Sequence, residues 1–354
     1  MFFGGPSNQT LGLDIGTHSV KAVLMENHRN SHRVLKAGVQ TIAFEGEYDP
    51  TQFRKAETIV AVKSLMNDLK ISPAKVKQLV SSIGGVATSM KEISSIQMAE
   101  EELATSLVFE ARKHLPLDDS DTVIDHQVLG EDPTDPQKLR ILLVATTRKM
   151  YAFHEDVLKE SGFRPGVVDI DPLAVLNSYS FLSELPDEGQ LLFLNLGTRH
   201  TNFIVTGRKS KLFNRDVPIG GHHFTAGIAK LKGVSYREAE MLKTSEGVAA
   251  FETGAEGNGG LALSLQSRTV LEDFVDDIRR TLRYYVKESG QSDFVKIWLT
   301  GGGAAFRGLP ELLAEKFGVE VAVWNPAEQI ESRTDLGHWG SQMTQCLGLA
   351  LRRE

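Results

Sequence analysis

The chain has 354 residues, a net charge of −7 at neutral pH, 41% hydrophobic and 24% charged residues, and a single cysteine, Cys346. The length suits two lobes with separate apolar cores, and the composition is ordinary for a globular protein. The acidic balance, without a basic tract, argues against nucleic-acid binding, and no apolar run approaches the ~20 residues that span a bilayer. One cysteine excludes an internal disulfide, and the first six residues lack an export-signal pattern, so a reducing, cytoplasmic location is expected.

The segment LGLDIGTHSVKAV near the amino end predicts two apolar strands joined by a tight turn. The first strand ends at Asp14, and Lys21 on the second strand lies seven residues later, across the hairpin. Successive backbone N–H groups in such a turn point into one concavity, which suits a phosphate group. We therefore expect Gly16, Thr17 and His18 to donate backbone N–H groups to phosphates and Lys21 to return its ammonium toward them. The alternative for Lys21 is an ordinary solvated strand lysine.

Three further elements with apolar periodicity extend this first lobe: a strand at 34–41, a helix at 59–69 and a strand at 79–83. From 89 to 165 the pattern changes to a strand, a helix, two strands and a helix, which predicts a small inserted α+β module. The main lobe then resumes with a strand at 167–170 and a helix beginning near Pro172. Asp171, directly before that proline, suits a helix N-cap.

The phosphate-loop pattern returns half a chain later as LFLNLGTRHTNFI. In this second copy Asn195, Gly197 and Thr198 stand in the places of Asp14, Gly16 and Thr17. Apolar residues again fall on apolar residues, a coincidence that chance seldom gives over two such hairpins. Two loops of this kind facing each other would hold a nucleotide's phosphates from both sides. The sequence therefore predicts a duplicated, two-lobed nucleotide-binding protein.

The rest of the second lobe contains a long amphipathic helix, a strand at 295–299 that ends in three glycines, and a closing helix in which Gly348 and Ala350 allow close packing. The glycines are Gly301, Gly302 and Gly303. They would let the backbone approach a flat purine, although a tight turn is the alternative. Glu240 and Lys243 lie three apart on one helical face, where an ordinary surface pair is the alternative to a binding role.

The two hairpins and the strand–Gly-Gly-Gly–helix unit resemble the phosphate and adenosine elements of the actin, sugar-kinase and heat-shock-chaperone superfamily. Within it, LGLDIGTHSVKAV, HLPLDDSDTVIDHQVLG and PIGGHHFTAGIAK followed by REAEMLK resemble the PilM family of type IV pilus assembly proteins, relatives of the cell-division protein FtsA. The resemblance covers nearly the whole chain. It implies an α/β, duplicated actin-like (ribonuclease H-like) two-lobed nucleotide-binding fold with an inserted small α+β subdomain. The implied domains are 1A at 7–88 and 166–188, 1C at 89–165, 2A at 189–217 and 294–354, and 2B at 218–293.

The resemblance also implies ATP and Mg²⁺ as cofactors. Asp14 would lie near the metal through water, and Glu240 with Lys243 would contact the ribose. Gly220 would loosen the backbone beside the same pocket. Asp171 resembles the acidic residue that orients the attacking water in relatives, so it is the candidate catalytic residue.

The second loop departs from the superfamily pattern at two positions. Asn195 and Asn202 stand where relatives carry aspartates. An amide keeps a hydrogen-bonding group but removes charge, so metal affinity and positioning of the attacking water should both suffer. We therefore expect slow ATP hydrolysis or none.

The resemblance implies a cytoplasmic ATP-binding scaffold that is recruited peripherally to the inner membrane. It would bind the amino-terminal cytoplasmic segment of a PilN-like membrane protein in a groove between the 89–165 insert and the first lobe. Other pilus platform proteins or ATPases, and a second copy of the chain, are further candidate partners. One alternative is an FtsA-like filament-forming division protein, although the ending LALRRE lacks the linker and amphipathic helix for membrane tethering. The other is an active ATPase or kinase of the same fold, which would want carboxylates at Asn195 and Asn202.

Overall fold

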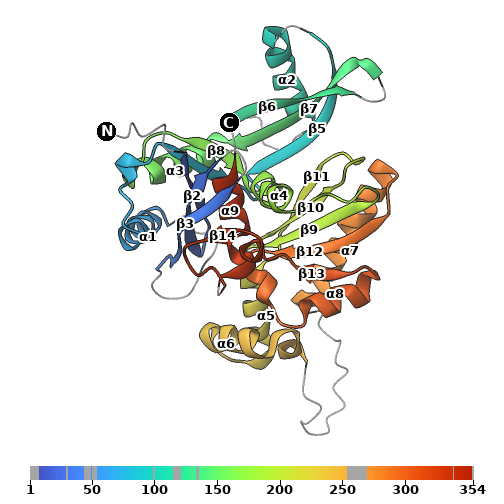
Figure 1. The fold of residues 1–354 in the computed structure, drawn as a ribbon. Helices are drawn as coiled ribbons and strands as arrows, with labels where there is room; N and C mark the ends of the chain where they lie inside the picture. The colour runs from blue at the N-terminus through green and yellow to red at the C-terminus, as the bar shows by residue number, and fades with distance from the viewer. Residues whose placement is uncertain are drawn as a thin grey trace.

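The computed structural model describes residues 8–28, 31–43, 49, 54–98, 100–114, 121–132, 135–252, 269–337 and 339–352. Three β-sheets organise this part of the chain (Figure 1). A six-stranded and a five-stranded sheet form the centres of two lobes, and a three-stranded sheet belongs to the insert. Figure 1 places the insert at the upper end of the molecule and the helices α5 and α6 at the lower end.

The first-lobe sheet has the order β14-β3-β2-β1-β4-β8. Its strands are β1 (Gln9–Ile15), β2 (Ser19–Asn27), β3 (His32–Thr41), β4 (Gln78–Ile83), β8 (Val167–Ile170) and β14 (Glu331–Ser332). The strands β1, β2 and β3 pair antiparallel, whereas β4 runs parallel to β1, and β8 runs parallel to β4. Each strand that the sequence predicted for this lobe lies in this sheet. Strands that are covered on both faces need apolar side chains on both faces, which explains the apolar runs of β1 and β4 at the centre of this sheet.

Helices cover both faces of this sheet. Leu11 and Leu13 of β1 pack with α1 (Lys55–Asp68) and α3 (Arg148–Glu160) on one face. On the other face, Val23 and Met25 of β2 pack against α9 (Thr344–Leu351), beside α4 (Asp171–Leu182). The alternation of the side chains along each strand therefore separates two helical layers.

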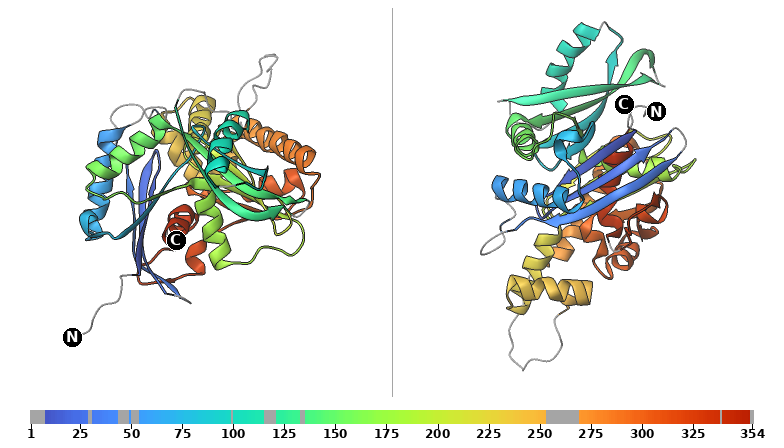
Figure 2. Two further views of the ribbon diagram at one scale, coloured as in Figure 1. Left: turned by 90° about the horizontal axis from the view of Figure 1, so that it is seen from above. Right: turned by 60° about the vertical axis from the view of Figure 1, so that its left-hand side comes forward.

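The insert has a core of its own. Its antiparallel sheet has the order β5-β7-β6, formed by β5 (Thr88–Ile96), β6 (Thr122–Asp132) and β7 (Asp135–Thr147). The helix α2 (Glu100–His114) packs Leu103 and Leu107 against Ile141 and Leu143. In contrast, Val157 of α3 packs into the first-lobe core, although α3 lies within the predicted 89–165 module. Figure 2 shows the insert sheet set apart from the first-lobe sheet.

The second-lobe sheet repeats the first in strand order. Its order is β11-β10-β9-β12-β13, formed by β9 (Gln190–Leu196), β10 (Thr201–Thr206), β11 (Phe213–Val217), β12 (Phe294–Thr300) and β13 (Val321–Val323). As in β3-β2-β1-β4-β8, three antiparallel strands are followed by two that run parallel to the hairpin's first strand. The duplication in the sequence is therefore a duplication of topology.

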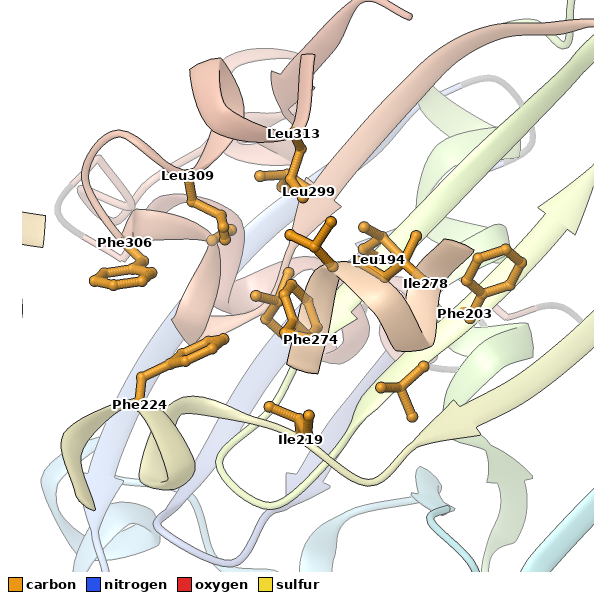
Figure 3. Close-up of a cluster of buried hydrophobic side chains, with 14 of the residues drawn as sticks. Leu194, Phe203, Ile219, Phe224, Phe274, Ile278, Leu299, Phe306, Leu309 and Leu313 are labelled. Atoms are coloured by element: carbon orange, nitrogen blue, oxygen red, sulfur yellow. The ribbon is translucent and has the colours of Figure 1, made fainter. Parts of the chain in front are cut away.

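Aromatic and aliphatic side chains fill the core of the second lobe (Figure 3). Its helices are α5 (Gly221–Lys232), α6 (Tyr236–Glu246), α7 (Val270–Ser289) and α8 (Leu309–Phe317). The long amphipathic helix that the sequence predicted is α7, in which Phe274 and Ile278 are fully inaccessible and Val270 and Leu282 are partly buried. Phe224 of α5 stacks on Phe306 with 5.2 Å between ring centroids. Burial of each such side chain contributes about 1.5–3 kcal/mol relative to exposure.

The closing helix α9 is held tightly between the β1 strand and α4. A Cβ atom on Gly348 would lie 1.7 Å from the carbonyl oxygen of Ala174, and one on Gly12 would lie 2.5 Å from the carbonyl oxygen of Cys346. Both approaches are closer than any real Cβ contact, so only glycine fits, as predicted for Gly348. Among the helices in the described ranges, none is long and apolar enough to cross a membrane.

Candidate functional site

The first hairpin brings Asp14 and Lys21 together as neighbours on paired strands. The strand register places Asp14 opposite Lys21, and Lys21 Nζ lies 2.8 Å from Asp14 Oδ2. Their side chains are only 8% and 12% exposed, so this ion pair is largely shielded from water. Gly16 closes the turn by donating its N–H to the carbonyl oxygen of Ser19 at 3.1 Å. The predicted hairpin and the crossing of Lys21 are therefore present, and the role of Lys21 toward phosphate stays a prediction.

The second hairpin carries amides in the corresponding places. Asn195 lies opposite Asn202 in the register, and Asn195 Nδ2 donates to Asn202 Oδ1 at 3.0 Å. Asn202 Nδ2 then donates to Asp216 Oδ1 on β11 at 2.5 Å. Burial raises the pKa of the Asp216 carboxyl, and the nearby His200 opposes that rise. The first hairpin therefore has an ion pair at the position where the second has two hydrogen-bonded asparagine side chains, the second of which donates to the Asp216 carboxylate.

Gln345, at the start of α9, connects the two hairpins. Its Nε2 lies 3.1 Å from Asp14 Oδ1, 2.9 Å from Asp171 Oδ1 and 3.0 Å from Ser82 Oγ. Its Oε1 accepts a hydrogen bond from Asn195 Nδ2 at 3.3 Å. The sequence reasoning did not select Gln345. The available signal was one amide in TQCLGLAL, a helix otherwise made of apolar and small residues.

Asp171 faces this group of residues rather than capping its helix. Ile170 is the N-cap residue of α4, and no side chain caps that helix, so the N-cap alternative for Asp171 is wrong. Burial, followed by the charge of Asp14, raises the pKa of Asp171 to about 7. A Cβ atom on Gly84 would lie 2.1 Å from Asp171 Oδ2, so the glycine at the end of β4 makes room for the carboxylate.

We call Asp14, Lys21, Asp171, Asn195 and Gln345 the inter-lobe site. Asp14 and Lys21 come from the first lobe, Asn195 comes from the second, and Asp171 and Gln345 stand at the first turns of the helices α4 and α9. Four of the five were candidate residues, and the structure places them in one hydrogen-bonded network. Within the described ranges, no three His, Cys, Asp or Glu side chains are grouped so that they could hold a metal ion.

A second group forms where α5 and α6 meet. Lys243 Nζ lies 2.7 Å from Glu240 Oε2 and 2.9 Å from Thr225 Oγ1. The Lys243 side chain is 17% exposed and that of Glu240 is 47% exposed, so the pair is half-buried, and its binding role stays a prediction. Burial opposes the ionisation of Glu240, yet the Lys243 ammonium holds the pKa of that carboxyl below its usual value. The Gly221 carbonyl oxygen accepts a further bond from Lys243 Nζ at 3.4 Å.

The loops that carry the remaining candidates converge between these two groups. The Gly197 carbonyl oxygen accepts the N–H of Gly221 at 2.9 Å, and the Thr198 carbonyl oxygen accepts the N–H of His222 at 3.0 Å. A Cβ atom on Gly220 would lie 2.6 Å from the Gly197 carbonyl oxygen, so Gly220 permits this close approach. The second hairpin is therefore fastened to the start of α5.

His18 and Thr17 are exposed on the turn of the first hairpin. The surrounding chain removes part of the water around the His18 ring and so lowers its pKa. Glu240 opposes this shift, and Lys21 and Lys243 add to it. The charges of α6 thus act on the first turn from the opposite lobe.

The three-glycine loop contacts the second hairpin. Gly301 has φ of +82°, and a Cβ atom there would lie 2.5 Å from Asn195 Oδ1. A Cβ atom on Gly303 would lie 2.8 Å from Leu196 Cβ, whereas one on Gly302 would meet nothing closer than Gln342 at 3.8 Å. Gly301 and Gly303 therefore allow the loop to pack on the hairpin, and Gly302 is the position with open space beside it.

Several known proteins are similar to this chain in sequence and fold. A family model described as type IV pilus assembly protein PilM matches residues 12–354. A solved PilM-PilN type IV pilus biogenesis complex contains a similar chain, with a TM-score of 0.80 and 23% identity over 98% of this chain and 99% of that chain. The ethanolamine utilization protein EutJ from Carboxydothermus hydrogenoformans is similar with a TM-score of 0.54 and 14% identity over 98% and 90% of the two chains.

Curated relatives include two FtsA proteins. FtsA of Helicobacter pylori strain J99 is 25% identical over 212 residues, which span 53% of this chain and 42% of that protein. The chain therefore matches less than half the length of this relative. FtsA of Borreliella burgdorferi is 24% identical over 386 residues, covering 97% of this chain and 90% of that protein. With the repeated sheet topology, these similarities confirm the predicted duplicated actin-like fold with an inserted α+β subdomain.

Proposed function

The chain belongs to the type IV pilus assembly protein PilM family, and from this premise we propose that it is an actin-like ATP-binding scaffold of the inner-membrane platform that assembles the pilus. The observation that carries the proposal is the similarity to the chain of a PilM-PilN complex over nearly the full length of both. The partner would be the amino-terminal cytoplasmic segment of a PilN-like membrane protein. Recruitment to the inner membrane would then come from that partner.

ATP would bind between the two hairpins and the start of α5. The N–H groups of Gly16 and Gly197 close their own turns on the carbonyl oxygens of Ser19 and His200. The donors for phosphate oxygens would therefore be the next turn N–H groups, at Thr17 and Thr198. Lys21 adds the one cation of the inter-lobe site. Glu240 and Lys243 would contact the ribose, and Gly302 leaves room for the purine. The negatively charged phosphates of ATP would be bound jointly by these N–H donors and lysine ammonium groups.

Hydrolysis of ATP would be slow or absent. A general base must be deprotonated and free to accept a proton from water. Asp171, with its pKa raised to about 7, is only partly ionised at neutral pH and already accepts a hydrogen bond from Gln345. The second hairpin offers the amides Asn195 and Asn202 where a carboxylate would help position water. Nucleotide would therefore act on conformation more than through turnover.

A switch of this kind needs an element that touches both lobes. Gln345 accepts from Asn195 of the second lobe and donates to Asp14 of the first, and its helix packs on β1 and α4. Closure of the lobes around ATP would shift the second hairpin relative to this helix and the first-lobe sheet, a hinge-type change. The groove for the partner, predicted between the insert and the first lobe, would open or close with it.

The predicted Mg²⁺ does not fit this site well. Both oxygens of Asp14 already hold partners, because Oδ2 binds Lys21 and Oδ1 binds Gln345. The described residues offer no third carboxylate or histidine in the same group. The proposed function therefore includes ATP and does not depend on Mg²⁺.

Calorimetric titration tests both halves of the proposal. The purified protein is titrated with ATP and, separately, with the amino-terminal peptide of a PilN-like protein, and phosphate release is followed in parallel. We expect both ligands to bind with little or no turnover. Lys21→Ala should weaken ATP binding at least about tenfold, since a charge-assisted hydrogen bond is worth about 1.5–3 kcal/mol. Lys63→Ala, on the exposed face of α1, is the matched control and should bind ATP normally.

Two results would count against the scaffold. Rapid turnover without peptide binding would favour the active ATPase or kinase. Polymers that form only with nucleotide, again without peptide binding, would favour the FtsA-like filament. Unchanged ATP affinity in a folded Lys21→Ala variant would remove the first hairpin from the binding site.

A further inference from the structure

Gln345 places an amide nitrogen at the point where the carboxylates of the inter-lobe site converge. Asp14 Oδ1, Asp171 Oδ1 and Ser82 Oγ all lie within 3.1 Å of its Nε2. An amide nitrogen carries two hydrogens, so it can satisfy two acceptors at a time. Ser82 also hydrogen-bonds to Asp171, which lets its oxygen accept from Gln345 while its own hydrogen goes to the carboxylate. A group of oxygen acceptors around one centre is also what a hydrated cation requires.

The donor set around this centre suits an amide better than a metal ion. Nitrogen atoms that carry hydrogens cannot ligate a cation, and Asn195 directs its Nδ2 toward Gln345 and Asn202. The Oδ1 atom of Asn195 instead lies against Gly301, 2.5 Å from where a Cβ atom would be. Both sides of the junction therefore present N–H groups where a metal shell needs oxygen.

The charge of Asp14 is also already balanced. Lys21 neutralises Asp14 at 2.8 Å in a pair that is nearly buried. Among the residues that the structure describes, no cation lies within hydrogen-bonding distance of Asp171, and its carboxylate is stabilised by the neutral donors Gln345 and Ser82. A divalent ion would have to displace the Gln345 amide and compete with the Lys21 ammonium.

We propose that the Gln345 amide occupies the position between the lobes that a hydrated cation would otherwise hold, so that this chain binds ATP without Mg²⁺. Gln345 is then a positioning residue that sets the metal independence of the site and links nucleotide binding to α9. The statement about ATP rests on the proposed function. The statement that the site excludes a divalent ion does not.

The test combines a metal titration without nucleotide and an ATP titration with and without metal. Binding of Mn²⁺ to the nucleotide-free protein is followed by electron paramagnetic resonance. ATP affinity is measured by calorimetry in Mg²⁺ and in EDTA. The variants are Gln345→Glu, which adds a carboxylate at the centre, and Gln345→Ala, which only removes the amide. Gln329→Glu adds the same charge at an exposed position outside the site and serves as the control.

We expect the wild-type protein and the control to bind no Mn²⁺ up to millimolar concentrations, and their ATP affinity to change less than about threefold between the two buffers. Gln345→Glu should gain Mn²⁺ binding and should bind ATP at least about tenfold more tightly in Mg²⁺ than in EDTA. Gln345→Ala should also gain Mn²⁺ binding, because Asp14 and Asp171 lose their amide partner. This second variant keeps the test valid where the added carboxylate prevents folding.

Tight Mn²⁺ binding by the wild-type protein, or a tenfold loss of its ATP affinity in EDTA, would overturn the inference. Equal Mn²⁺ binding by the wild-type protein and both Gln345 variants would overturn it as well. Absence of ATP binding in either buffer would refute the proposed function, and the Mn²⁺ titration would then decide on Gln345 alone.

Discussion

Replacement of Asp171 by asparagine should stabilise the protein relative to the wild type, and this stabilisation should increase as the pH rises. The pKa of Asp171 lies at about 7 in the folded protein, compared with an ordinary value of 3.8, because burial and the charge of Asp14 disfavour its ionisation. Between these two values the folded state binds more protons than the unfolded state. The free energy of unfolding therefore falls with increasing pH through this range, and the loss is complete above pH 7.

The magnitude follows from the size of this pKa shift. One pKa unit corresponds to 1.36 kcal/mol, so the full rise is worth roughly 4 kcal/mol. Asp171 keeps part of its surface accessible, which reduces the cost of ionising it. We therefore expect Asp171→Asn to gain about 2 kcal/mol relative to the wild-type protein between pH 5 and pH 8. The asparagine can still accept the hydrogen bond from Gln345, so little should change at low pH.

Urea unfolding of the two proteins at several pH values measures this difference. The variant must be compared with the wild type at each pH, because other titrating groups also make the free energy of unfolding depend on pH. Asp68→Asn, at an exposed position near the end of α1, is the matched control and should show a difference that does not vary with pH. A difference between Asp171→Asn and the wild type that stays constant within about 0.5 kcal/mol from pH 5 to pH 8 would show that Asp171 is not held in its protonated form.

Three further substitutions test other parts of the structure. Gly348→Ala should lower the free energy of unfolding by roughly 2–4 kcal/mol, because the added Cβ would lie 1.7 Å from the Ala174 carbonyl oxygen, and denaturant unfolding measures it. Asn195→Asp should raise the Mg²⁺ dependence of ATP binding or turnover. A variant with the same Mg²⁺ dependence as the wild type would show that Asn195 does not belong to any metal shell. Burial lowers the pKa of His154 to about 4, so its contribution to stability is lost as the pH falls below 6.5. The loss of unfolding free energy between pH 7 and pH 4 should therefore be smaller in His154→Gln than in the wild type, by up to about 3 kcal/mol. Urea unfolding of both proteins at pH 4 to 7 measures this difference.

The hairpins were predictable because their geometry is local. A glycine in a short turn between two apolar strands determines which residues lie opposite each other, so Asp14 meets Lys21 and Asn195 meets Asn202. The same reasoning predicted the buried face of α7 and the close packing of Gly348. Each of these predictions depends on the period of a strand or helix, or on the absence of a Cβ atom.

Local reasoning offered a wrong alternative for Asp171 and missed Gln345. The sequence offered an N-cap for Asp171, because an acidic residue before proline is common at that position, but its carboxylate faces Asp14 and Gly84 instead. Gln345 looked like one polar residue on a closing helix. Its importance comes from partners as far as 331 positions away in the chain.

The two hairpins, the duplicated lobes and the family could therefore be predicted from the sequence, because these depend on the order of residues within short segments. Which charges meet between the lobes depends instead on how the helices and sheets pack. The packing of α9 against β1 and α4 places the Gln345 amide between Asp14 and Asp171, and burial there raises the pKa of Asp171. Such effects arise from the distance between groups and the exclusion of water, which no spacing along the chain specifies.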